Sequence, residues 1–157
     1  MATITKSQHR TMQHGAPYGN VTALPFNLTT TAAGAAKNSN SAAAVGDGDK
    51  VILGTLPAGF TLLDFVGTVS DAFTALTVGK IGFEYVDGVD DASVPQDDDY
   101  FAAALTLHTL GLYRKTTTTA PKRLPKDAYL TLVSSGAAHA AAGVLDVSVI
   151  GELTGPN

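Results

Sequence analysis

The segment Lys50–Ser70, KVILGTLPAGFTLLDFVGTVS, decides the fold. Apolar and β-branched residues run on both sides of a short turn, LPAG, in which Pro57 presets φ and Gly59 accepts a positive φ. Such runs, bounded by turn residues, are typical of β-strands rather than helices. We therefore expect two strands, residues 50–56 and 60–70, joined by this turn.

The second of these strands also predicts which side chains face the core. Because successive side chains of a strand point to opposite faces, Leu63, Phe65 and Val69 are expected on one face and Leu62 and Val66 on the other. The same strand signal recurs at intervals along the chain, in residues 80–85, 128–133 and 143–151. Alternation places Ile81, Phe83 and Tyr85 inward in the first of these and groups Leu145, Val147 and Val149 on one face of the last. The chain of 157 residues fits one domain. Short strands between turn signals, with no long helical period, predict an all-β fold, an antiparallel sandwich or barrel.

One segment leaves two interpretations open. DDDYFAAALTLHTLG, residues 97–111, has acidic residues at its start, apolar residues at helical spacing and Gly111 where a helix would end. Its alternation suits a strand equally well. If residues 98–110 form a short helix, Asp97–Asp99 would cap its N-terminus.

The composition excludes several classes of site. There is no cysteine, which excludes disulfides and thiolate metal sites, and charged residues are only 15%. So little charge suggests that part of the surface is covered by a protein partner or by another copy of the chain. We find no signal peptide and no apolar run long enough to span a membrane, and we expect a soluble chain made in the cytoplasm, with no membrane partner.

The chain divides into an arm and a body. Residues 1–19 are polar, without periodicity and poor in core-forming side chains, which predicts an extended flexible N-terminal arm. Residues 20–157 are expected to form a single β-sandwich body. No acidic residue precedes Asp47, so the arm is basic.

Half of the acidic residues fall in residues 84–99. The acidic loop that we single out contains Asp87, Asp90, Asp91, Asp97, Asp98 and Asp99. Its spacing does not match a calcium-binding EF-hand loop, and charge density alone does not supply the converging geometry that a hard cation needs. A glycosidase pair of carboxylates is disfavoured in a chain without Trp. We expect this loop to face solvent or a neighbouring subunit, with no metal bound.

Five of the ten basic residues follow within thirteen positions. They form a candidate basic surface for contact with a partner, composed of Arg114, Lys115, Lys122, Arg123 and Lys126. Net charge is −4, and the basic residues are not interleaved with aromatic residues beyond Tyr113 and Tyr129, so nucleic acid is not the expected partner. Solvated surface loops would explain the same charges equally well.

No catalytic or cofactor-binding motif is present. His108 and His139 are isolated in sequence, and no H-x-H or H-E-x-x-H pattern occurs. Ser134 and Ser135 lack the G-x-S-x-G turn of a nucleophilic serine, and no phosphate-binding glycine loop follows a strand. We expect a protein without enzymatic activity, catalytic residues, cofactor or metal.

A series of short blocks resembles a known family. KVILGTLPAGFTLLDFVGTVSDAF, GKIGFEYVDG, DDDYF, LGLYR, APKRLPKDAYLTL and AAGVLDVSVIGEL follow one another in the order seen in head decoration, or capsid cement, proteins of tailed bacteriophages. The resemblance covers about residues 45–153. It implies a non-enzymatic, antiparallel jelly-roll-like β-sandwich that binds the outer surface of an assembled capsid as a homodimer or homotrimer.

The resemblance also implies partners and a location. The partners would be the major capsid protein and other copies of this chain, and the location would be the outer surface of the virion. The residues expected to carry the arm's contact with the capsid are Lys6, His9, Arg10, His14 and Tyr18. The alternative is a carbohydrate-binding β-sandwich, as in an adhesin or fibre tip, which requires exposed aromatic residues gathered on one face.

Overall fold

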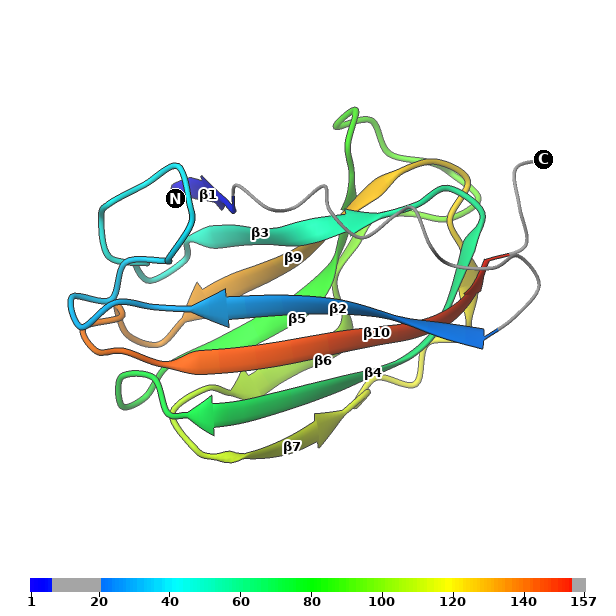
Figure 1. The fold of residues 1–157 in the computed structure, drawn as a ribbon. Coiled ribbons are helices and arrows are strands. Elements are labelled where there is room, and N and C mark those ends of the chain that lie inside the picture. The colour runs from blue at the N-terminus through cyan, green and yellow to red at the C-terminus, as the bar shows by residue number, and fades with distance from the viewer. Residues whose placement is uncertain (7–20, 154–157) are drawn as a thin grey trace.

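The computed structural model describes residues 1–6 and 21–153, which form a sandwich of two β-sheets (Figure 1). No helix forms in this part of the chain, and the predicted all-β, jelly-roll-like sandwich is confirmed. The strands are β1 (Thr3–Thr5), β2 (Val21–Thr29), β3 (Lys50–Leu56), β4 (Phe60–Asp71), β5 (Val78–Tyr85), β6 (Asp97–Thr106), β7 (Gly111–Arg114), β8 (Lys122–Arg123), β9 (Ala128–Ser135) and β10 (Val144–Leu153).

The two sheets have different strand orders. The first sheet runs β1-β3-β9-β5-β6, and the second runs β2-β10-β4-β7, with β8 also paired to β4. The turn LPAG carries the chain from β3 in the first sheet to β4 in the second, and Gly59 has the positive φ expected there, 79°. All strand pairs are antiparallel except β1 with β3.

The core lies between the sheets and is built from the alternating positions. Ile81, Phe83 and Tyr85 face inward from β5, as predicted. An aromatic cluster joins the sheets, because Phe65 of β4 lies 5.7 Å from Phe101 of β6, measured between ring centroids. Offset and edge-on ring pairs of this kind stabilise a core beyond the area that they bury.

The predicted facing of β4 is only partly correct. Phe65 and Val69 are buried as expected, but Leu62 is buried as well, whereas Leu63 is half-exposed. The pairing of β4 with β10 shifts between Ile150 and Gly151, and this irregularity reverses the alternation near Leu62. A bulge inserts one residue into one strand, so a strict period of two fails across it.

The first six residues belong to the sandwich. Thr3–Thr5 pair in parallel with residues 50–52 of β3, and Ile4 is 2% exposed. The sequence predicted that this stretch would be part of an extended arm, because it contains only one large aliphatic residue besides Met1. Ile4 fills a core position. A strand of three residues is too short to show the alternation by which strands are found in a sequence. The remainder of the predicted arm, residues 7–19, lies outside the described residues.

Residues 97–106 form strand β6, so the alternative of a short helix near 98–110 is wrong, and so is helix capping by Asp97–Asp99. Ile81 of β5 pairs with Ala102 of β6, and Phe83 pairs with Asp97. A step of two residues along β5 thus corresponds to a step of five residues along β6. The extra residues form a large, irregular bulge in β6. Tyr100, Phe101 and Ala102 are consecutive and all buried because of it, and this placement mimics the run of apolar residues on a helix.

Candidate functional site: the charged end of the sandwich

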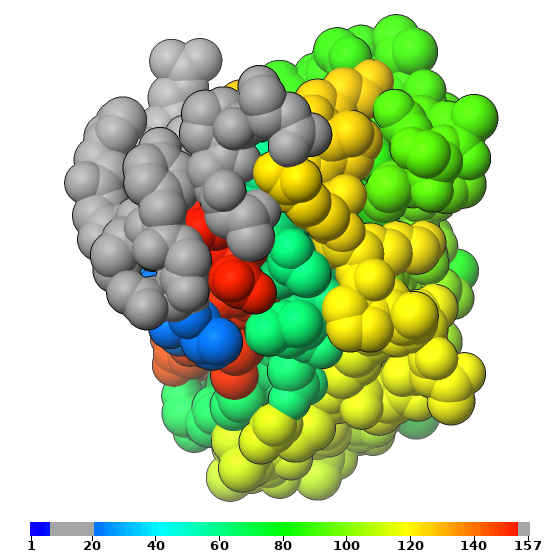
Figure 2. All heavy atoms as spheres, turned by 90° about the vertical axis from the view of Figure 1, so that its right-hand side faces the viewer, coloured from blue at the N-terminus to red at the C-terminus, as the bar shows by residue number. Residues whose placement is uncertain are grey.

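The acidic loop and the candidate basic surface meet at one end of the sandwich, which we call the charged end. It consists of the acidic loop with the start of β6 (residues 86–99) and the segment 115–127. Figure 2 views this end, where the green loop around residue 90 and the yellow segment around residue 120 lie side by side over the turn that follows β3. The sequence predicted the two segments as separate charged surfaces, and it gave no indication that they meet.

Three acidic residues shape the loop between β5 and β6. Asp87 accepts a hydrogen bond from the backbone N–H of Val89 (3.0 Å), Asp91 accepts one from Ser93 (2.8 Å), and Asp90 accepts one from Gln96 (2.7 Å). Bonds of this type hold Asx-turns. The hydroxyl and backbone N–H of Ser93 hold the pKa of the Asp91 carboxyl below its usual value. These carboxylates therefore have a structural role.

Tyr85 anchors the same loop to the body. Its hydroxyl donates to the backbone oxygen of Val94 (2.5 Å), and its backbone N–H donates to the side chain of Gln96 (2.7 Å). Burial, with a smaller contribution from the nearby aspartates, raises the pKa of Tyr85 to about 12. The hydroxyl therefore stays protonated and keeps donating its hydrogen bond throughout the physiological range.

One lysine of the basic segment, Lys126, makes three contacts with this loop and its anchor. The Lys126 ammonium lies 2.7 Å from the carboxylate of Asp87, donates to the backbone oxygen of Val89 (2.6 Å) and sits 4.6 Å from the centroid of the Tyr85 ring. The hydrogen bond from Lys126 holds the pKa of Asp87 below its usual value. Exposed ion pairs stabilise weakly, but this one is combined with a cation–π contact and fixes the orientation of both segments.

The three consecutive aspartates at the start of β6 also have lysine neighbours. Asp97 lies 3.7 Å from Lys122, and Asp98 lies 3.4 Å from Lys80. A hydrogen bond from Asp99 to Asp97 raises the pKa of the Asp99 carboxyl. The three carboxylates have oxygen atoms within 4.8 Å of one another, which is close enough for a cation in principle. Two of the three already face an ammonium group, so the donors do not converge on an open position.

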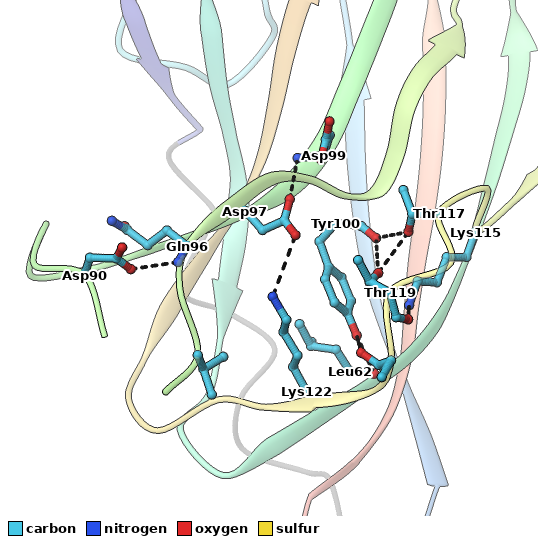
Figure 3. A network of polar contacts seen from close by, with 12 residues as sticks. Leu62, Asp90, Gln96, Asp97, Asp99, Tyr100, Lys115, Thr117, Thr119 and Lys122 are labelled. Carbon is cyan, nitrogen blue, oxygen red and sulfur yellow. Dashed lines mark hydrogen bonds and ion pairs between the residues drawn. The ribbon is translucent and has the colours of Figure 1, made fainter. Parts of the chain in front are cut away.

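Tyr100 joins the two sheets beneath the basic segment (Figure 3). Its hydroxyl lies 3.0 Å from the backbone oxygen of Leu62 in β4 and 3.0 Å from that of Ala120. Lys115 lies 4.2 Å from the centroid of its ring and donates to the backbone oxygen of Thr119 (2.6 Å). Burial raises the pKa of Tyr100 to about 12, so this hydroxyl is also a permanent donor.

The segment 115–120 protects the outer edge of β6. The backbone N–H of Thr116 donates to the backbone oxygen of Phe101 (3.0 Å), and the hydroxyl of Thr117 donates to that of Tyr100. An uncovered edge strand offers unpaired backbone groups to other chains. Here threonine hydroxyls and backbone amides use those groups within the molecule.

Replacing Tyr100 with phenylalanine is expected to lower the free energy of unfolding by about 1–2 kcal/mol, because the buried backbone oxygen of Leu62 loses its donor and Ala120 loses the same one. The measurement is urea unfolding of the variant against the unmodified chain. Tyr113→Phe is the matched control, since the Tyr113 hydroxyl also contacts two backbone oxygens, of Thr106 (2.9 Å) and Thr109 (3.0 Å), at a more exposed position where water replaces it. Equal effects of the two substitutions would contradict the assigned role of Tyr100.

The remaining predicted site residues have other partners or lie outside the described residues. Arg114 pairs with Asp64 on the outer face of the second sheet. Arg123, in β8, pairs with Thr61 of β4 through the backbone register. Lys6 is buried and donates to the backbone oxygen of Asn27, so it does not extend outward from an arm. The other predicted arm contacts, His9, Arg10, His14 and Tyr18, lie outside the described residues.

The sequence missed a buried pair at the opposite end of the sandwich. The Ser134 hydroxyl lies 2.9 Å from Nε2 of His139, and the two residues are 0% and 1% exposed. Nδ1 of His139 is buried and has no hydrogen-bond partner. Although serine and histidine at this distance resemble part of a catalytic triad, neither side chain is accessible to a substrate. Nothing in the sequence marks the pair, because Ser134 lies near the end of β9 and His139 lies in the connection that follows it.

The sequence matches no described protein family and no curated protein. Two solved structures are similar in fold. The chain aligns over 99% of its length with the whole of a chain from the capsid of Ralstonia phage GP4, with a TM-score of 0.70 and 18% identity. It aligns over 90% of its length with 94% of a chain from the capsid of cyanophage Pam1, with a TM-score of 0.58 and 15% identity. At these identities the likeness shows a shared fold, and both neighbours are chains of phage capsids.

The structure bears on two further predictions from the sequence. In residues 1–6 and 21–153 there is no helix of a length and hydropathy suited to crossing a membrane. No aromatic side chain is among the exposed large hydrophobic residues of the same region, and Tyr85 and Tyr100 are buried. The described residues therefore lack the exposed aromatic face that the carbohydrate-binding alternative requires.

Proposed function

We propose that this chain is a structural, non-enzymatic protein of a bacteriophage virion, which binds the outer surface of the assembled capsid. The observation that supports the proposal most strongly is the likeness to the GP4 capsid chain, because it extends over the full length of both chains. The order of sequence blocks noted above supports the same role independently.

We further propose that the chain acts as a homodimer or homotrimer that clamps neighbouring major capsid subunits. A shell that holds packaged DNA is weakest where subunits meet. A multivalent clamp across such a junction stabilises it through effective concentration, even when each single contact is weak. The low content of charged residues, 15%, fits a chain that covers part of its surface in an assembly.

Residues 7–19 are proposed as the segment that reaches a neighbouring capsid subunit, through His9, Arg10, His14 and Tyr18. This division differs from an arm that begins at Met1, because Ile4 is part of the core. A truncation that removed residues 1–19 would therefore damage the body together with the arm. The test must leave residues 1–6 intact.

The expected result is that the chain binds undecorated capsids of its parent virus at a fixed ratio to the capsid subunits. A variant with serine at positions 9, 10, 14 and 18 should bind at least about tenfold more weakly. It still loses conformational entropy when the segment orders on the capsid, but it lacks the side-chain contacts that would offset this cost. The measurement is co-sedimentation over a range of protein concentrations.

Two controls accompany the experiment. Thermal unfolding should be the same for the chain and the variant, since the replaced residues lie outside the described body. Thr118→Ser is a control substitution at an exposed position of the charged end. Absence of saturable binding by the unmodified chain would contradict the virion role, whereas equal binding by both forms would contradict only the role of the arm.

A further inference from the structure

Four side chains with complementary chemistry lie near β1 and β2, which are edge strands of the two sheets (Figure 1). Lys6 follows β1 directly, while Asn27 on β2 and Asp146 on β10 are partners in the strand register. The Lys6 ammonium contacts the backbone oxygen of Asn27 and lies 3.4 Å from its side-chain oxygen Oδ1. Thr29, also on β2, is the fourth residue.

The nucleophile in this group is the lysine amine. Lys6 is 8% exposed, which is unusual for lysine. Burial lowers its pKa, and the charge of Asp146 opposes that shift with a smaller effect. A desolvated lysine more readily provides the neutral amine, which is the form that attacks a carbonyl carbon.

The electrophile is the side-chain amide of Asn27. The hydroxyl of Thr29 donates a hydrogen bond to Oδ1 at 2.9 Å, on the oxygen where negative charge would develop during attack. The amide nitrogen Nδ2 donates to the carboxylate of Asp146 at 2.7 Å, so a proton acceptor is placed beside the group that would leave. The 3.4 Å contact with Oδ1 places Nζ beside the side-chain amide of Asn27, and attack on Cγ requires the amine to move from the oxygen to the carbon.

We propose that Lys6 and Asn27 form an intramolecular isopeptide bond, with Asp146 as the proton carrier and Thr29 as the oxyanion donor. The neutral Nζ amine attacks Cγ of Asn27, and the carbonyl electron pair moves to Oδ1. Asp146 takes a proton from the attacking nitrogen and delivers it to Nδ2. The carbonyl re-forms, the Cγ–Nδ2 bond breaks, and ammonia leaves. One N–C bond forms and one breaks, so no oxidant or other reactant is required.

The bond would join the two sheets covalently at an edge where, among the described strands, β1 and β2 are not paired with each other. β1 is the edge strand of the first sheet and β2 is the edge strand of the second. Lys6 and Asn27 are 21 residues apart in sequence, so the crosslink would close a ring containing the segment between β1 and β2. A covalent ring of this kind holds the short strand β1 in place even when its few backbone hydrogen bonds open.

The test is intact-mass spectrometry of the purified, denatured full chain. The expected mass is lower than that of the Lys6→Arg variant, after correction for the substitution, by one ammonia, about 17 Da. Arginine keeps the positive charge but has no nucleophilic amine. Digestion and tandem mass spectrometry should then identify a branched peptide that joins Lys6 to Asn27.

Two variants separate the bond from other chemistry. Asparagine can also lose ammonia by cyclising onto its own backbone, but that product would persist in Lys6→Arg and would contain no branched peptide. Asp146→Ala should fold, and its isopeptide bond should form at least about tenfold more slowly, because the proton carrier is lost. An unmodified mass for freshly purified and for aged protein, with Lys6 recovered in a linear peptide, overturns the proposal.

Discussion

Replacing Gly82 with alanine is expected to lower the free energy of unfolding by about 3 kcal/mol or more, or to prevent folding, which is the largest effect of a single methyl group that we predict. A Cβ atom at this position would lie 2.0 Å from the backbone oxygen of Asp97 and 2.4 Å from the backbone carbon of Asp98. Backbone atoms cannot rotate away as side chains can. The backbone of the β6 bulge therefore packs directly against Gly82, in the space that a Cβ atom would occupy.

Guanidinium unfolding of Gly82→Ala measures this cost. Gly79→Ala is the matched control, because it lies on the same strand and its Cβ would meet only side-chain methyl groups, of Leu107 at 3.2 Å and Leu132 at 3.4 Å. Those groups can shift by a few tenths of an ångström, so the control should cost less than about 1 kcal/mol. A Gly82→Ala variant as stable as the Gly79→Ala variant would show that β6 does not require the bulge.

Acidification is expected to destabilise the chain through His139. Burial lowers the pKa of this histidine to about 4, whereas an unfolded histidine titrates near 6.5. Between these values the unfolded state binds a proton that the folded state does not, so stability falls as pH decreases from about 6.5 to about 4 and this contribution then levels off. The loss through this one residue is up to about 3 kcal/mol.

The measurement compares urea unfolding at about pH 7 and about pH 4.5 for the chain and for His139→Asn. The substitution leaves a smaller side chain and lowers stability at both pH values, so only the difference between the two pH values is informative. That difference should be smaller in His139→Asn, whereas His108→Asn, at a half-exposed position, should retain it. An equal pH dependence in all three proteins would contradict the role of His139.

The sheet architecture was predictable from sequence wherever a strand has several residues of alternating character. Residues 80–85 and 143–151 alternate cleanly, and both are strands with the predicted inward faces. The turn at Pro57–Gly59 was predictable because its residues have strong conformational preferences. These are local signals, and they need no knowledge of distant partners.

The errors come from interactions between segments that are distant in sequence. β6 is a strand because a bulge allows Tyr100 and Phe101 both to enter the core, and β1 is a strand because β3 offers it an edge. The meeting of Lys126 with Asp87, 39 residues apart, depends on the whole topology. The same holds for Lys6 with Asn27, since no single stretch of sequence contains both.

The mutual pairing of charges at the charged end has a consequence for the speed of association. Lysines that already sit beside carboxylates form short-range dipoles, and the field of a dipole decays with distance faster than that of a separate charge. Long-range attraction normally accelerates encounter and weakens steeply as salt increases. The paired lysines of this end should therefore add little to the salt dependence of association, which the excess of carboxylates in the same segments should set.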